Sequence, residues 1–396
     1  MTDEHGIGEP GVGQQRWTSP GDATHPSTPA MPQVAPIGWT PPPKPGLIPL
    51  RPLDLGTILG AAFRVLRRNP KPTFGAALLI QGSVYLLLIL VVTGVTFGAL
   101  SRIDSSTAKN AGQITAGATG LVVVASIIPG LLAVIASAVL QGIIVLEVSR
   151  GAVGEKLTFR ALWKRARGRI GALVGWAALL VLASTVLVGI IVVIIVFLGV
   201  SFGTGGIIAA VLIGILAFFG LVVVYVWLGT KFALVPSVLM IERMSIRASI
   251  ARSWSLTEGY FWRTFGISAL VAVIVGIVSQ VVSVPLNFIA PIAGGLVDPQ
   301  GQKGGGAILL VAVLSVLVVV IAVVFQSITS VVQSATIALI YLDLRIRKEG
   351  LDLELVHYVE AKQTGGASVT DPLLRGAPAT GVPTNGVPVH HELPWA

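Results

Sequence analysis

The chain has 396 residues, of which 54% are hydrophobic and only 11% are charged, and its mean hydropathy is +0.86. Soluble domains carry about 25% charged residues, so this composition excludes an ordinary soluble protein and indicates an integral membrane protein. The formal charge of +9 favours anionic lipid headgroups over nucleic acid as partners, and the absence of cysteine excludes disulfides and thiolate chemistry.

The first 50 residues contain eleven prolines among Gly, Thr and Ser, and no apolar run. Such a segment cannot bury enough apolar surface to offset its ordering entropy, so we expect residues 1–50 to form a disordered, Pro-rich cytoplasmic tail. The opening residues lack the basic and apolar regions of a secretory signal peptide. The run PPPKP at 41–45 is interpreted as a stiff linker or as a ligand for an aromatic groove in a protein partner.

Residues 51–361 are expected to form an all-α membrane domain with six transmembrane helices. Six apolar segments reach the roughly 20 residues that cross the hydrocarbon core. Pro129 and Pro285 lie inside two of them and are expected to kink the helices. The Gly-, Pro- and Thr-rich residues 362–396 are expected to form a disordered tail. The predicted spans are 74–100, 118–148, 170–200, 206–235, 264–292 and 307–342.

Lysine and arginine are distributed unequally between the two sides of these spans. Clusters within residues 16–71, 150–169, 231–263 and 345–375 fall on one side, and only Arg102, Lys109 and Lys303 fall on the other. The positive-inside rule therefore places the basic side, and both termini, in the cytoplasm. Trp and Tyr residues near that side, Tyr341 among them, are expected in the headgroup layer.

Each odd-numbered span is preceded by a basic amphipathic segment. Residues 55–66 place apolar side chains on one helical face with Asp54 as N-cap, Thr158 caps the second segment, and residues 246–254 repeat the pattern. We interpret the chain as three pseudo-repeats, each an in-plane cytoplasmic basic helix followed by a transmembrane hairpin. The same charges also retain the loops inside the cell. The candidate contacts for anionic lipid are Arg64, Arg67, Arg68, Lys71, Arg160, Lys164, Arg165, Arg167, Arg169, Arg247 and Arg252.

The sequence holds no recognisable catalytic or cofactor-binding constellation. Four of the five histidines lie in the predicted tails, and neither a phosphate-binding loop nor a metal-ligand cluster occurs. We therefore expect no enzyme activity and no cofactor. The acids nearest the membrane, Glu147, Glu242 and Asp343, are interpreted as salt-bridge partners of nearby arginines; an enzyme would need them to form a cytoplasmic pocket.

Amide side chains also lie within the predicted spans. Such amides join helices by hydrogen bonds, or, if they converge on one cavity, suit a neutral or lipid-like substrate. The residues are Gln81, Gln141, Gln280, Asn287, Gln326 and Gln333.

Three stretches together resemble a known family: RPLDLGTILGAAFRVLRRNPK from Arg51, IERMSIRASIARSWSLTEGYFWRTFGI from Ile241 and YLDLRIRKEGLDLEL from Tyr341. They resemble actinobacterial polytopic membrane proteins related to the membrane domain of glycerophosphoryl diester phosphodiesterases, over about residues 50–355. The resemblance implies an all-helical domain, mostly of unknown function, in a bacterial inner membrane. It does not imply catalysis, because the phosphodiesterase active site belongs to a separate soluble barrel to which no segment of this sequence corresponds.

These observations favour a non-enzymatic integral membrane protein that serves as a membrane scaffold or lipid-interacting module, with inner-leaflet lipids as its partners. The alternative is a transporter, lipid translocator or permease component. That alternative requires a cavity lined by the amides within the spans, and a bundle packed solid at that depth would count against it.

Overall fold

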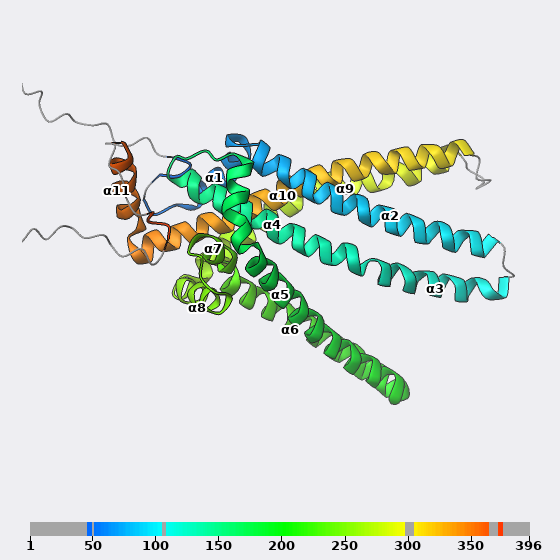
Figure 1. Cartoon of the computed structure of the whole chain (residues 1–396). Coiled ribbons are helices and arrows are strands. Elements are labelled where there is room, and N and C mark those ends of the chain that lie inside the picture. Colours follow the sequence, from blue (N-terminus) through cyan, green and yellow to red (C-terminus); the bar gives the residue numbers. More distant parts are fainter. Residues whose placement is uncertain (1–45, 50, 105–107, 298–304, 364–370, 375–396) are drawn as a thin grey trace, which may run out of the picture. The chain divides into compact units, whose positions relative to one another are not determined.

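The computed structural model describes residues 46–49, 51–104, 108–297, 305–363 and 371–374. These residues form eleven α-helices and one short π-helix, and no strand occurs among them (Figure 1). The elements are α1 (Leu55–Arg68), η1 (Lys71–Gly75), α2 (Ala76–Asp104), α3 (Ala108–Ala125), α4 (Ile127–Ala152), α5 (Phe159–Ser201), α6 (Gly203–Phe232), α7 (Val235–Ile241), α8 (Ile246–Thr257), α9 (Phe261–Val297), α10 (Gly305–Glu349) and α11 (Leu351–Gln363).

Six stretches are long and apolar enough to cross a membrane, as predicted. The second span is divided between α3 and α4 at Ser126, because Pro129 has no N–H to bond the carbonyl of Ala125, the last residue of α3. Pro285, by contrast, lies within the continuous helix α9. The stretches are Lys71–Gly98, Ala116–Ala152, Phe159–Ser201, Gly203–Ile241, Phe261–Ile289 and Val313–Glu349.

The predicted N-caps are present, but the three basic segments differ from one another. The Asp54 carboxylate accepts a hydrogen bond from the Thr57 N–H (3.2 Å), and the Thr158 hydroxyl accepts one from the Ala161 N–H (3.4 Å). The first and third segments form the separate helices α1 and α8. The second is not a separate in-plane helix, because residues 159–201 contain no proline and continue into the span as α5.

The apolar face of α1 is divided between protein and surroundings. Ile58, Ala62 and Val65 are buried where α1 packs on α10, whereas Leu55 and Phe63 remain exposed. Protein therefore covers part of this face, and the in-plane position of α1 stays a prediction. The buried side of α8 differs from the one predicted by the apolar pattern of residues 246–254. It consists of Ser249, Ser253, Leu256 and Thr257.

The folded region begins before residue 51, contrary to our predicted boundary. Leu47 and Ile48 are buried, and the Leu47 N–H donates to the Gly151 carbonyl at 2.7 Å. Gly46 approaches the same carbonyl so closely that a Cβ would lie 2.5 Å from its oxygen. Residues 371–374 also lie in a predicted tail, yet Leu373 is buried. The other predicted tail residues, apart from 49, 362 and 363, lie outside the described residues.

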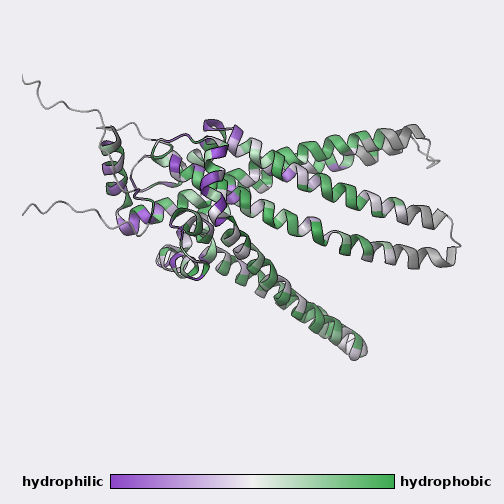
Figure 2. Ribbon diagram, viewed as in Figure 1, coloured by the Kyte–Doolittle hydropathy of each residue, from purple (hydrophilic) through white to green (hydrophobic). Residues whose placement is uncertain are grey.

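Most of the fully buried side chains lie at one end of the spans, which we call the basic end. There α1 packs on α10, α7 packs on α4, and α8 packs on α6, α7 and α10. Hydrophilic residues concentrate at this end, whereas the far parts of α5 and α6 are hydrophobic (Figure 2). None of the most apolar 18-residue window of α5 is buried, as expected for a surface that faces lipid.

Candidate functional site

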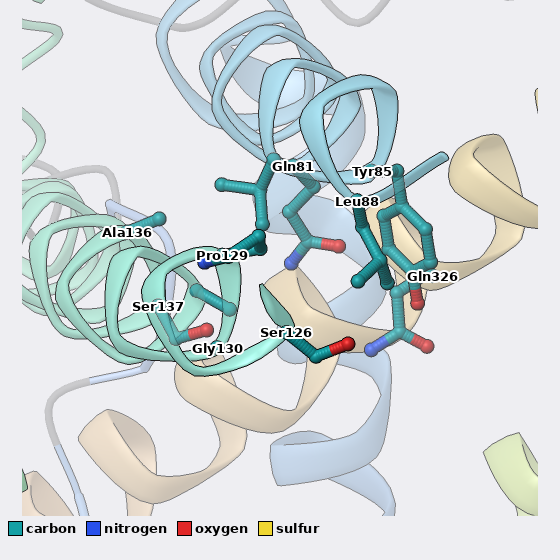
Figure 3. Close-up of a pocket in the computed structure, with 11 residues that line it drawn as sticks. Gln81, Tyr85, Leu88, Ser126, Pro129, Gly130, Ala136, Ser137 and Gln326 are labelled. Atoms are coloured by element: carbon teal, nitrogen blue, oxygen red, sulfur yellow. The ribbon is translucent and has the colours of Figure 1, made fainter. Parts of the chain in front are cut away.

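Three adjoining cavities lie beside α4, within the membrane-spanning helices. The first, about 470 Å³, lies between α2, α4 and α10, and Figure 3 shows the polar groups of Gln81, Ser126 and Gln326 directed into it. The second, about 510 Å³, shares Gln81 and Gln326 with the first and adds Gln141 and Gln333. The third, about 410 Å³, shares Gln141 with the second and extends between α5 and α6.

Four of the six predicted amides thus line one set of cavities, which we call the amide cavities (Gln81, Gln141, Gln326 and Gln333). The other two do not line them. Gln280 is exposed on α9, and the Asn287 amide donates to the Ser283 carbonyl of its own helix at 2.8 Å. The condition that the alternative function requires, amides that share a cavity, is therefore met by four residues, of which Gln326 and Gln333 are exposed like Gln280.

The lining of the amide cavities is mostly apolar, with a few amides and hydroxyls and no formal charge. No Asp, Glu, His, Lys or Arg side chain is among their lining residues in the described part of the chain. Gln81 is only 8% exposed, and its Oε1 has no hydrogen-bond partner among the described residues. Gln81 follows Lys71 by ten positions, about 15 Å along a helix, and therefore lies well within the first apolar stretch. An unsatisfied amide at that depth favours a ligand that can donate a hydrogen bond.

Glu242 lies in a buried ionic network at the basic end. Its side chain has no solvent exposure and accepts hydrogen bonds from the Tyr341 hydroxyl (2.7 Å) and from Nε of Arg252 (3.2 Å). Arg252 also pairs with Glu349, which pairs in turn with Arg345 at 3.0 Å. The predicted salt bridge is confirmed. Tyr341 is fully buried, so its predicted place in the headgroup layer is wrong.

Asp343 joins the first residues of the domain to α9 and α10. Its carboxylate accepts the Leu53 N–H at 2.8 Å and pairs with Arg263 and Arg347, both at 3.0 Å. The two guanidinium groups also donate to the Leu53 carbonyl. The predicted salt-bridge role of Asp343 is therefore confirmed.

Glu147 differs from the other two acids because its hydrogen-bonding partner is an amide. The Asn69 side chain donates to its Oε1 at 3.1 Å and to the Leu157 carbonyl at 2.9 Å. The expected salt bridge to an arginine is absent among the described residues, where Arg68 donates instead to the carbonyls of Gly151 and Glu155. None of the three acids lines the amide cavities.

The basic residues predicted to contact lipid fall into three groups. Arg68, Arg169 and Arg252 are bound to the protein itself, Arg169 through the Met244 carbonyl at 3.2 Å. These three are poor lipid contacts because their guanidinium groups already have partners. Arg64 and Arg165 are exposed and make one long contact each, to the Leu47 carbonyl (3.4 Å) and to Glu155 (3.9 Å). The exposed remainder are Arg67, Lys71, Arg160, Lys164, Arg167 and Arg247.

Sequence reasoning missed the residues that complete these networks. Asn69 bonds Glu147, and Asp371, which lies in a predicted tail, pairs with Arg150. No sequence pattern near Asn69 or Asp371 indicates that its partner lies far away along the chain. No group of three or more His, Cys, Asp or Glu that suits a metal occurs in the described residues.

Comparisons with known proteins do not place the chain in a family. No family model, curated protein or solved structure matches it. The fold and the site therefore rest on the residues and geometry given above.

Proposed function

We propose that this chain is a non-enzymatic integral protein of the bacterial inner membrane that binds lipids, with both termini in the cytoplasm. The six apolar helices are compatible with a multi-pass membrane protein. The distribution of Lys and Arg supports the orientation, and the family resemblance of the three stretches supports the bacterial setting.

The observation that carries this proposal is the exposed group of six cations at the basic end. They belong to α1, η1, α5 and α8, and all six are exposed. A cation near an anionic leaflet contributes about 1 kcal/mol to lipid binding. The internally bonded arginines make a smaller contribution because leaving their partners would cost hydrogen bonds.

Native mass spectrometry of the full-length protein with phosphatidylglycerol tests this proposal. We expect the triple substitution of Arg67, Lys71 and Arg160 by Gln to weaken retention of this anionic lipid by up to about 3 kcal/mol, or roughly a hundredfold. The matched control replaces Arg102, Lys109 and Lys303, which the positive-inside rule places on the opposite side. Equal retention of phosphatidylglycerol by the two triple variants would refute the proposal.

The amide cavities favour a second candidate function, the binding and translocation of an uncharged amphiphile. The cavities adjoin one another from α2 to α6, and their lining offers amides and hydroxyls but no formal charge. A ligand with hydroxyl groups and acyl chains matches this lining better than an ion does.

Movement of a fluorescent diacylglycerol analogue across proteoliposome bilayers tests the second function. We expect Gln81→Leu to slow protein-dependent movement at least tenfold, because it removes the buried amide. Gln280→Leu, which changes an amide outside the cavities, is expected to have no effect. Protein-independent movement, or an equal effect of both substitutions, would reject translocation through these cavities.

A further inference from the structure

A short segment near the C-terminus is docked on the basic end. It comprises residues 371–374, Asp-Pro-Leu-Leu, which we call the docked segment, and seven residues separate it from the end of α11. The Asp371 carboxylate pairs with Arg150 at the end of α4. Leu373 is 1% exposed, whereas the next residue, Leu374, is 38% exposed.

The domain contacts both the side chains and the backbone of the docked segment. Arg345 of α10 donates to the carbonyls of Leu373 (3.4 Å) and Pro372 (3.5 Å). Asp371 fixes the turn internally, because its carboxylate accepts the Leu373 N–H at 3.1 Å and its carbonyl accepts the Leu374 N–H at 3.1 Å. Arg150 and Arg345 are themselves largely buried, with side chains 13% and 6% exposed. The site thus consists of two largely buried arginines and the apolar pocket that Leu373 fills.

We propose that the basic end carries a peptide-recognition site which selects an acidic residue followed, two positions later, by leucine, and that the docked segment occupies this site and is exchanged for such a segment of a partner protein. Arg150 recognises the acid, Arg345 recognises the backbone, and the hole filled by Leu373 recognises the leucine.

Exchange follows from the small size of the contact. A single fully buried leucine and one charge pair must offset the entropy of ordering four residues, so the docked state has little margin. A cavity of about 260 Å³ remains beside Leu373 and Leu374, lined also by Arg165, Met240 and Arg243, so the docked segment does not fill its surroundings completely.

The tether explains why the site is filled in the isolated chain. A connection of seven residues gives an attached segment an effective concentration on the order of 1 mM. A free peptide that binds the vacant site with a Kd of about 100 µM would therefore bind the intact protein about tenfold more weakly.

The experiment measures binding of a labelled peptide of residues 367–377 to the full-length protein in detergent, by fluorescence anisotropy. The double variant Asp371→Ala and Leu373→Ala releases the docked segment, and we expect it to bind the peptide about tenfold more tightly than the unchanged protein does. Leu374→Ala is the matched control, because that leucine is exposed, and it is expected to bind like the unchanged protein.

Two altered peptides test recognition without any further change to the protein, so their result does not depend on protein stability. Peptides with Asp371→Asn or Leu373→Ala are expected to bind the released protein at least tenfold more weakly than the original peptide. The proposal is overturned if the released variant binds no more tightly than the unchanged protein, or if the altered peptides bind as well as the original.

Discussion

Replacing Arg252 by Ala tests whether the buried ionic network holds α8 in place. The substitution removes a cation 3.2 Å from a Glu242 carboxylate that has no solvent exposure, and it also removes the pair with Glu349. Glu349 is 26% exposed and retains Arg345, so the main cost falls on Glu242. Breaking a buried ion pair by removing one partner costs about 3–5 kcal/mol, and we expect a loss of stability in that range.

Unfolding by sodium dodecyl sulfate, followed by tryptophan fluorescence, measures this loss. Trp254 of α8 packs edge-to-face on Trp227 of α6 with ring centroids 5.5 Å apart, so its fluorescence reports on the docking of α8. Arg165→Ala is the matched control, because its contact to Glu155 is long and its side chain 41% exposed. We expect the control to cost less than about 1 kcal/mol.

Two further variants separate the charge effect from simple loss of packing. Tyr341→Phe removes only the hydroxyl that donates to Glu242, and we expect a cost of about 1.5–3 kcal/mol for a hydrogen bond to a charged group. Replacing both Glu242 and Arg252 by Met removes both charges and is expected to cost less than Arg252→Ala alone. If Arg252→Ala costs no more than the Arg165 control, the network does not stabilise the fold as reasoned here.

Three other predictions follow from local contacts. Gly46→Ala is expected to detach the N-terminal segment at a cost of about 1–3 kcal/mol, because its Cβ would meet backbone oxygens, and faster proteolysis near residue 46 would detect this. Its control, Gly60→Ala, has open space around the new Cβ in a helix and is expected to stabilise the protein by about 0.4–1 kcal/mol. Hydrogen bonds from Thr57 lower the pKa of the exposed Asp54 carboxyl, so its contribution to folding is complete above the ordinary Asp pKa and is lost as the pH falls through the lowered value. Carbon-13 NMR titration of Asp54 checks this, and Thr57→Val should return the pKa toward its ordinary value; an unchanged pKa would contradict it. Asp343→Asn is expected to cost about 3–5 kcal/mol in the same detergent unfolding assay, because it leaves two arginines without their anion, and a cost below about 1 kcal/mol would show that the buried carboxylate is dispensable.

The sequence was informative wherever structure depends on neighbours along the chain. Span number follows from the length of apolar runs, and the caps at Asp54 and Thr158 follow from side chains that reach an N–H three residues ahead. The sequence located six amides within the spans, but it did not indicate which of them share a cavity.

Tertiary structure decided the use of each polar residue. Arg67 and Arg68 are adjacent and chemically identical, yet Arg67 is exposed and Arg68 binds the carbonyls of Gly151 and Glu155, more than 80 residues away. The contacts of Leu53 with Arg263, of Glu242 with Tyr341 and of Asp371 with Arg150 likewise join distant segments. Apolar periodicity specifies which side of a helix turns inward, but the partner of a charged group depends on which helices pack together, and that packing is a property of the whole fold.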